Sequence, residues 1–390
     1  MKYRRFGKTE LQMPLFSCGG MRYQQGDDKL TWDEVKKENQ DNINATIARA
    51  FELGINHIET ARGYGSSEMQ LGPALAQLPR DQVRVQTKIG VTPDADDFFK
   101  VFEVSLDRLK LDYLDLLSIH GVNSQKMIDL AFKKNGCYEA LVKLKEQGRV
   151  RHIGFSTHGN PDIIIQAIDA GDFEYVNLHW YYIFQNNWPA VRHAAEKDMG
   201  VFIISPSDKG GMLYEPTEKF LELCKPLHPM VFNDLFCLCR PEVHTLSIGA
   251  ARPSDFDEHL KALDLLDRAD EVISPIKKCL DQAMIDCLGE EWVKTWDQGL
   301  TYNETVEGLN IWVLLFLWNL IKTYHMTGYG KMRYDIFGTG GHWFPGDPIK
   351  GVDELRKLNL AEKLPNSPHA DKITACLEET YELLHEPAVI

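Results

Sequence analysis

Short apolar runs alternate with longer segments of helical period from residue 50 to 260, and this alternation is the strongest constraint on the fold. Several of the helical segments end at a glycine, which can terminate a helix: Gly54, Gly148, Gly171 and Gly200. Eight strand–helix units in a row predict an α/β fold, namely a parallel sheet closed into a (β/α)8 TIM barrel. The expected strands are 15–18, 57–59, 83–88, 114–120, 152–156, 175–179, 201–205 and 245–248.

A doubly wound open sheet is the alternative to a barrel. Such a sheet usually has a glycine-rich phosphate turn directly after its first strand. Gly19 and Gly20 follow the first strand here, but no G-x-G-x-x-G motif leads into a helix. Residues 3–16 are predicted to form a hairpin with its turn at residues 7–9. In a barrel this hairpin would cover the bottom, where the strands begin.

The pattern changes near residue 270, where a helical and aromatic segment begins. Its tryptophans are Trp292, Trp296, Trp312, Trp318 and Trp343. We therefore expect two parts, a barrel over residues 1–270 and a helical C-terminal extension over residues 271–390. The apolar run 311–321 is about half the length needed to span a bilayer, so it predicts a buried helix and no membrane partner.

Charge and cysteine usage limit the partners and the compartment. The formal net charge of -14 leaves no basic stripe for a nucleic-acid backbone. The eight cysteines are scattered without zinc-type pairs, so we expect no metal site. Free thiols and an N-terminus without a signal-peptide pattern predict the cytoplasm. The sequence leaves the oligomeric state open.

Polar, proton-capable side chains follow three of the predicted strands. Glu59, Lys88 and His120 each end a strand, and Tyr64 lies in the loop after Glu59. Parallel strands bring these ends to one face, where the four groups would form a proton-relay site.

Each of the four side chains has an expected chemical role. Tyr64 is the natural proton donor to a carbonyl oxygen, and Lys88 would lower the phenol pKa from its ordinary value of about 10. Glu59 would hold Lys88 in place, and His120 would orient the substrate oxygen. Ordinary structural roles are the alternative: an inward ion pair of Glu59 with Lys88, a core histidine and a loop aromatic.

Several segments together resemble the aldo-keto reductase family. The stretch Gly54 to Gly65 is similar to the family signature G-x-x-x-x-D-T-A-x-x-Y-G. The strand ends at Lys88 and His120, residues 148–156 and the pair Ser205-Pro206 also match, in the right order. The resemblance covers roughly residues 1–265 and implies a (β/α)8 barrel that reduces a small carbonyl compound with NADP(H).

The resemblance also implies residue roles. Tyr64 would be the acid, Lys88 its activator, His120 the orienting group and Glu59 the fourth member, in a place where the family usually has aspartate. Ile204 stands where many members have an aromatic residue. Cofactor contacts are expected from the strand ends and the loops after them, at Gly20, Met21, Ser156, Asn177, Ser205, Lys209, Gly249, Ala250, Arg252 and Glu258.

Within that set, Ser156 and Asn177 would hold the nicotinamide amide, and Ser205 would line the diphosphate path. Arg252 precedes a helix N-terminus, which suits an anionic phosphate and favours NADP over NAD. Trp180 and Tyr181, with Arg22 on the other side, would line an aromatic substrate pocket. Two functional alternatives stay open: an NADP(H)-binding regulatory protein with weak or no turnover, and a dehydrogenase working in the oxidative direction.

The tail resembles the ferredoxin-like extension that ends some family members. Residues 308–311 are loosely similar to the G-[IV]-x-I-P stretch of that extension, but residues 288–307 contain no cysteine. Cys279 and Cys287 alone are too few and too far apart for an iron–sulfur cluster. The resemblance implies an extension that has lost its cluster, and that either covers the barrel mouth or packs on the outer helices.

Overall fold

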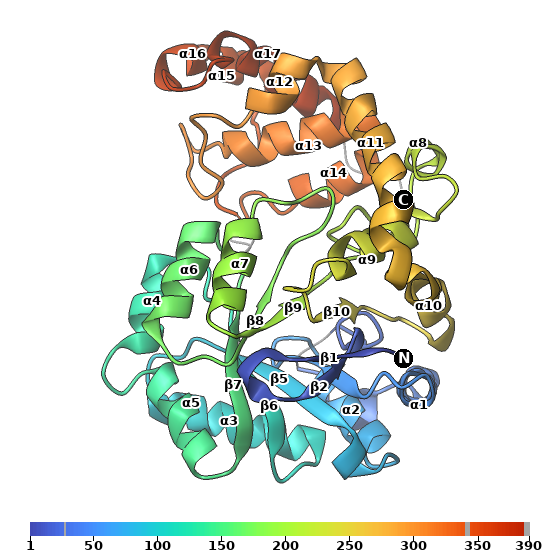
Figure 1. Cartoon of the computed structure of the whole chain (residues 1–390). Helices are drawn as coiled ribbons and strands as arrows, with labels where there is room; N and C mark the ends of the chain where they lie inside the picture. Colours follow the sequence, from blue (N-terminus) through green and yellow to red (C-terminus); the bar gives the residue numbers. More distant parts are fainter. Residues whose placement is uncertain (27–28, 340–343, 386–390) are drawn as a thin grey trace. The chain divides into compact units, whose positions relative to one another are not determined.

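The computed structural model describes residues 1–26, 29–339 and 344–385. Eight parallel strands close into a barrel in the order β10-β3-β4-β5-β6-β7-β8-β9 (Figure 1). The predicted TIM barrel is therefore confirmed. The strands are β3 (Phe16–Gly19), β4 (His57–Glu59), β5 (Arg84–Gly90), β6 (Leu114–His120), β7 (Val150–Ser156), β8 (Tyr175–Leu178), β9 (Gly200–Ile203) and β10 (Thr245–Ile248).

Each barrel strand lies where an apolar run predicted one, with ends that agree or differ by at most two residues. Strands buried on both faces read as near-continuous apolar runs, which is why they are easy to find. The end of β5 is an example of a shift. Its ladder with β6 continues past Lys88 to the pair of Gly90 with His120.

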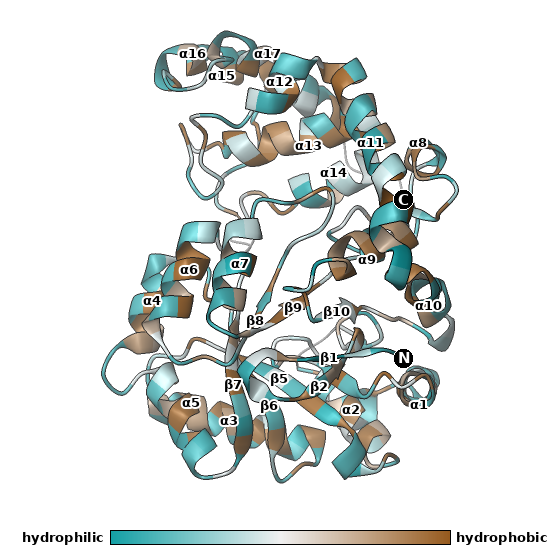
Figure 2. Ribbon diagram, viewed as in Figure 1, coloured by the Kyte–Doolittle hydropathy of each residue, from teal (hydrophilic) through white to brown (hydrophobic). Residues whose placement is uncertain are grey.

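Helices follow most of the strands and surround the barrel. Figure 2 shows both hydrophobic and hydrophilic residues on them, as expected for helices with one face against a sheet. Their bounds are α1 (Lys37–Glu52), α2 (Ser67–Leu75), α3 (Ala95–Leu109), α4 (Gln125–Phe132), α5 (Cys137–Glu146), α6 (Pro161–Ala170), α7 (Trp188–Glu196), α9 (Pro229–Leu238) and α10 (Phe256–Leu265).

The N-terminal hairpin closes the bottom of the barrel, as predicted. It consists of β1 (Tyr3–Arg5) and β2 (Gln12–Pro14), paired antiparallel. The Phe6 ring is fully buried and lies 5.8 Å from the ring of Tyr175, the first residue of β8. Gly200, the first residue of β9, makes room for this ring, because a Cβ atom there would lie 2.6 Å from Phe6.

The chain divides into two compact units. The first contains residues 1–210 and 233–269, and the second contains residues 211–232 and 270–390. Residues 211–232 thus belong to the second unit although they precede residue 270, where the sequence predicts the single boundary between two domains. That domain division stays a prediction.

The second unit is helical. The apolar run forms α13 (Ile311–Tyr324), which is mostly brown in Figure 2, and Asn319 within it accepts a hydrogen bond from Trp292 Nε1 at 2.8 Å. No helix in the described ranges is long and apolar enough to cross a membrane. Trp343 lies outside the described residues. The other helices are α8 (Glu218–Leu223), α11 (Ala269–Leu288), α12 (Glu290–Thr295), α14 (Thr327–Tyr334), α15 (Val352–Lys357), α16 (Leu360–Lys363) and α17 (Ala370–Leu384).

Candidate active site

The four polar residues converge at the carboxyl end of the barrel. Glu59 is the last residue of β4, Lys88 lies near the end of β5, and His120 is the last residue of β6. These strands are neighbours in the closed sheet, so their ends lie side by side. Tyr64 lies in the short loop between β4 and α2. The convergence expected from parallel strands is therefore present.

Lys88 is fully buried, and each of its three ammonium hydrogens has an acceptor. The Nζ atom forms an ion pair with Glu59 Oε2. It also donates to the backbone oxygen of Thr60 at 2.8 Å and to the hydroxyl of Tyr64 at 3.4 Å. Lys88 thereby joins the carboxylate to the phenol.

The Tyr64 ring is held between two of these groups. The Lys88 Nζ atom lies 4.7 Å from the ring centroid. The His120 ring meets it edge to face, with centroids 5.7 Å apart and planes at 83°. A small group bound beside the Tyr64 hydroxyl would therefore also lie close to the imidazole, which is the arrangement required to donate a proton and orient an oxygen together.

Burial and charge oppose each other in this cluster. Burial lowers the pKa of Lys88, but Glu59 and Tyr64 outweigh it, so the pKa of Lys88 lies above its ordinary value. Burial raises the pKa of Tyr64, whereas the Lys88 charge lowers it by less. The expected lowering of the Tyr64 pKa is thus wrong as a net effect, because desolvation of the phenolate dominates. Tyr64 is a protonated phenol at neutral pH.

A neutral histidine lies below the cluster. Burial, and then the Lys88 charge, lower the pKa of His57 to about 3. Its Nδ1 atom lies 2.7 Å from the hydroxyl of Ser17 on β3. His57 therefore adds no second cation to compete with Lys88 for Glu59.

Two residues expected at the cofactor amide have compatible polar atoms. Asn177 on β8 is fully buried, and its Oδ1 accepts from Gln86 Nε2 at 3.3 Å. Its Nδ2 atom is buried and has no hydrogen-bond partner among the described residues. Ser156 ends β7, and its hydroxyl accepts from the backbone N–H of Gly121, next to His120, at 3.2 Å. An unused buried amide donor fits a carboxamide oxygen of a nicotinamide ring.

Comparison with known proteins agrees with this geometry. The model of the aldo/keto reductase family matches residues 17–234, which is more than half of the chain. The chain belongs to the aldo/keto reductase family. Members of this family are oxidoreductases that typically depend on NAD(P)H and act on small carbonyl compounds.

Curated relatives cover the chain to different extents. L-galactose dehydrogenase from Arabidopsis thaliana is 27% identical over 276 residues, which are 62% of this chain and 85% of the relative. An aldo-keto reductase from Mycobacterium sp. (strain KMS) is 37% identical over 127 residues, 32% of this chain and 44% of the relative. The chain therefore spans most of the first relative but less than half of the second.

Solved structures support the fold. The holo form of an aldo-keto reductase from Bacillus halodurans has a TM-score of 0.60 at 21% identity and covers 72% of this chain and 96% of that one. An aldo-keto reductase from a Medee basin deep-sea metagenome library has a TM-score of 0.54 at 21% identity. The match covers 70% of this chain and 93% of that one.

The loop after β10, where this family member is expected to hold a cofactor phosphate, contains a carboxylate. Asp255 accepts from the backbone N–H of Ala251 at 2.8 Å and from Arg252 Nε at 3.1 Å. Arg22 lies 3.7 Å from the same carboxylate and donates to the backbone oxygen of Gly249 at 2.7 Å. Arg22, predicted for substrate, thus lies at the loop after β10, where two arginines flank one aspartate.

The other predicted cofactor residues occupy neighbouring loops. Gly20 follows β3, where a Cβ atom would lie 2.9 Å from the Glu59 backbone oxygen, and Met21 beside it is 57% exposed. Ser205 follows β9 in a left-handed conformation, with φ of 53°. Ala250 is buried beside Gly249, and Glu258 pairs with Lys261 on α10. These positions leave the cofactor assignments as predictions.

The two aromatic residues predicted for substrate are packed against protein. Trp180 is 3% exposed and stacks on Phe236, with ring centroids 4.9 Å apart. Tyr181 is 1% exposed, and its hydroxyl lies 2.8 Å from His179 Nδ1. Their described contacts are with Phe236 and His179, whereas Arg22 contacts the loop after β10.

Sequence reasoning missed two histidines at strand ends. His179 directly follows β8, and its Nε2 atom lies 2.5 Å from Nδ1 of His158, two residues after β7. The Nζ atom of Lys209, predicted for cofactor, lies 3.3 Å from His158 Nδ1 and 3.4 Å from His179 Nε2. The criterion that found His120, a polar residue at the end of an apolar strand, applies equally to His179.

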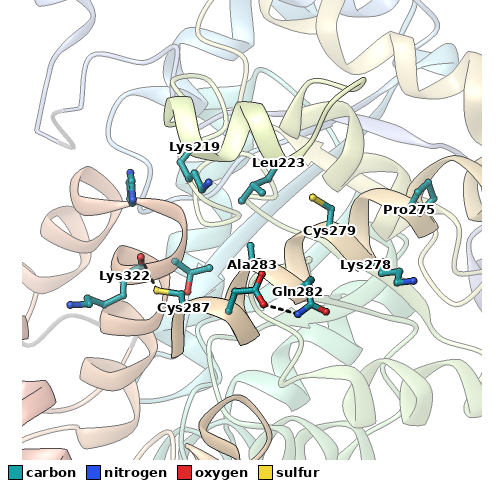
Figure 3. A pocket seen from close by; sticks show the side chains of 12 residues that line it. Lys219, Leu223, Pro275, Lys278, Cys279, Gln282, Ala283, Cys287 and Lys322 are labelled. Carbon is teal, nitrogen blue, oxygen red and sulfur yellow. Dashed lines mark hydrogen bonds between the residues drawn. The ribbon is translucent and has the colours of Figure 1, made fainter. Parts of the chain in front are cut away.

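The second unit contains a separate hollow of about 740 Å³. Residues from α8, α11 and α13 line it, including Cys279 and Cys287, and the thiol of Cys287 donates to the backbone oxygen of Lys322 (Figure 3). Across the described ranges, no group of three His, Cys, Asp or Glu side chains is placed to hold a metal ion. The hollow includes none of the four polar residues, so it is not the expected reaction site.

Proposed function

We propose that this protein is an NADPH-dependent reductase that converts an aldehyde or ketone to an alcohol, with Tyr64 as the proton donor. The observation that carries the proposal is the position of Lys88, whose ammonium contacts both Glu59 and the Tyr64 hydroxyl. A cation held in this way stabilises the phenolate that forms when Tyr64 gives up its proton.

The division of work follows from the contacts. The chemistry that a dinucleotide would supply, when bound, is hydride for the carbonyl carbon. Tyr64 donates its proton to the carbonyl oxygen, and His120, edge-on to the same ring, orients that oxygen. Glu59 keeps Lys88 charged and in place, because the ion pair raises the pKa of Lys88. Asn177 and Ser156 would hold the carboxamide of the nicotinamide.

NADP is the proposed form of the cofactor. Arg22 and Arg252 place two cations against the single carboxylate of Asp255 in the loop after β10. Cations at this loop favour a phosphate over a ribose diol, which prefers a carboxylate. The cytoplasm stays the proposed location, and the eight free thiols are compatible with it.

A dehydrogenase working in the oxidative direction is the second candidate. It is favoured by the similarity to L-galactose dehydrogenase, which extends over 85% of that relative. The same four side chains serve both directions, with Tyr64 accepting a proton from an alcohol in place of donating one.

The test is a two-direction assay of the purified protein. NADPH consumption is followed with a panel of aldehydes and ketones, and NADP reduction is followed with the matching alcohols and sugars. Carbonyl-dependent NADPH consumption is expected. Tight NADPH binding without turnover in either direction would instead indicate a nucleotide-binding regulatory protein and contradict the proposal.

A further inference from the structure

Glu59 reaches a serine that lies outside the group of four. The hydroxyl of Ser247 on β10 donates to Glu59 Oε1 at 3.2 Å, while Oε2 of the same carboxylate pairs with Lys88. Both side chains are buried, with Ser247 5% exposed. The two oxygens of Glu59 are thus used by two different partners, one on each side of β4.

This contact spans a strand. The barrel order is β10-β3-β4, so β3 lies between Ser247 and Glu59. The residue of β3 that pairs with Glu59 is Gly19. A Cβ atom on Gly19 would lie 2.4 Å from the Ser247 hydroxyl and 3.3 Å from Glu59 Oε1. The absence of a side chain at residue 19 therefore opens the path along which the serine and the carboxylate meet.

The length of the side chain matters in this arrangement. Glutamate is longer than the aspartate usual at this position by one methylene, which extends it by roughly 1.5 Å. The longer side chain brings one oxygen to β10 while the other stays on Lys88 of β5. A shorter aspartate has less reach toward β10.

We propose that Ser247 is a positioning residue for Glu59, with Gly19 providing the passage, and that this pair allows a glutamate to serve at this position. The inference rests on the proposed reductase function. Ser247 acts through Glu59 on Lys88, so that the third ammonium hydrogen stays directed at Tyr64. Ser247 itself does not contact the reacting atoms.

The test is a double-mutant cycle in the NADPH-bound enzyme. Ser247→Ala is expected to lower kcat about tenfold in the wild type, because a displacement of less than 1 Å at the reacting group has effects of this size. In the Glu59→Asp background the same substitution should change kcat by less than about twofold. The Kd for NADPH should stay constant throughout, and Ser247→Thr, which keeps the hydroxyl, should restore most of kcat.

The passage is tested by Gly19→Ala, which blocks the contact. It should lower kcat at least as much as Ser247→Ala, and Glu59→Asp should partly relieve the loss by withdrawing the carboxylate. Ser17→Ala is the matched control. Ser17 lies two residues before Gly19 on β3, and its described hydrogen bonds are with His57 and Thr245, not with Glu59. This control should lower stability while leaving kcat unchanged.

A second readout does not depend on turnover. Ser247→Ala should lower Tm by about 2 °C in the wild type and leave Tm unchanged in Glu59→Asp. Equal losses of kcat or of Tm in both backgrounds would overturn the positioning role. If the wild type reduces no carbonyl, the reductase proposal fails, and the coupling in Tm still decides whether Ser247 holds Glu59.

Discussion

Replacing Tyr64 with phenylalanine isolates the proton-donating group. The phenylalanine ring can keep the edge-to-face contact with His120 at 5.7 Å and the contact with Lys88 Nζ at 4.7 Å. Only the hydroxyl is removed, and its single described hydrogen bond, from Lys88, is long at 3.4 Å. Lys88 retains Glu59 and the Thr60 backbone oxygen as partners. The substitution should therefore leave the site intact.

The expected magnitudes follow from these contacts. General acid catalysis contributes about 10²- to 10⁴-fold, so kcat for carbonyl reduction should fall by that factor, or ~3–5 kcal/mol in the barrier. Stability should change by less than about 1 kcal/mol, because the only described hydrogen bond that is lost is long. The Kd for NADPH should stay within about twofold, since the hydroxyl is assigned to the substrate oxygen.

The assay compares single-turnover reduction with NADPH titration for the wild type and Tyr64→Phe. Tyr113→Phe is the matched control, because Tyr113 precedes β6 at the opposite end of the barrel and holds its ring 4.0 Å from Arg80. The control should reduce carbonyls at the normal rate. A Tyr64→Phe enzyme that retains more than about a tenth of the wild-type rate would refute the assignment of Tyr64 as the acid.

Four further outcomes are expected. Arg252→Ala should weaken NADPH binding about tenfold and NADH binding by less than about twofold, and equal weakening would contradict a 2′-phosphate contact. Asn177→Ala should weaken both cofactors about tenfold through the lost amide donor, as titration would show. The reductive kcat should stay level from neutral pH into the range near pH 10 where an ordinary phenol ionises, because burial raises the pKa of Tyr64 above its ordinary value; a fall near pH 7 would contradict this. His57 binds its proton only in the unfolded chain between pH 6.5 and about 3, so the free energy of unfolding should drop on acidification through that window by on the order of 5 kcal/mol. The drop should be smaller in His57→Gln when urea denaturation is measured at several pH values.

The barrel strands and the four polar residues could be predicted because both depend on local signals. A strand buried on two faces needs a run of apolar residues, and a closed parallel sheet brings the strand ends together whatever the loops contain. Glu59, Lys88 and His120 follow from that rule alone. The hairpin also followed, since the turn at Gly7 has φ of 53°, which favours glycine.

The remaining features depend on contacts between distant segments. The hydrogen bond from Ser247 to Glu59 crosses a strand and needs the open space at Gly19, which no local pattern records. Arg22 was expected near Trp180, yet its guanidinium meets Gly249 and Asp255, more than two hundred residues along the chain. Residues 211–232 join the second unit for the same reason, because tertiary packing decides it.

The balance between burial and the Lys88 charge decides which protonation state of Tyr64 is populated before either direction of the proposed reaction begins. In the proposed mechanism reduction begins with a phenol and oxidation begins with a phenolate, so the pKa of Tyr64 sets the fraction of enzyme that is ready for each at a given pH. An ordinary phenol is ionised to about 0.1% at pH 7, and the raised pKa of Tyr64 reduces this fraction further. Lys88 does not make the phenolate the main form, since its effect on that pKa is smaller than the effect of burial. At neutral pH the site therefore starts in the form that donates a proton, and oxidation of an alcohol should accelerate about tenfold for each unit of rising pH until Tyr64 is ionised.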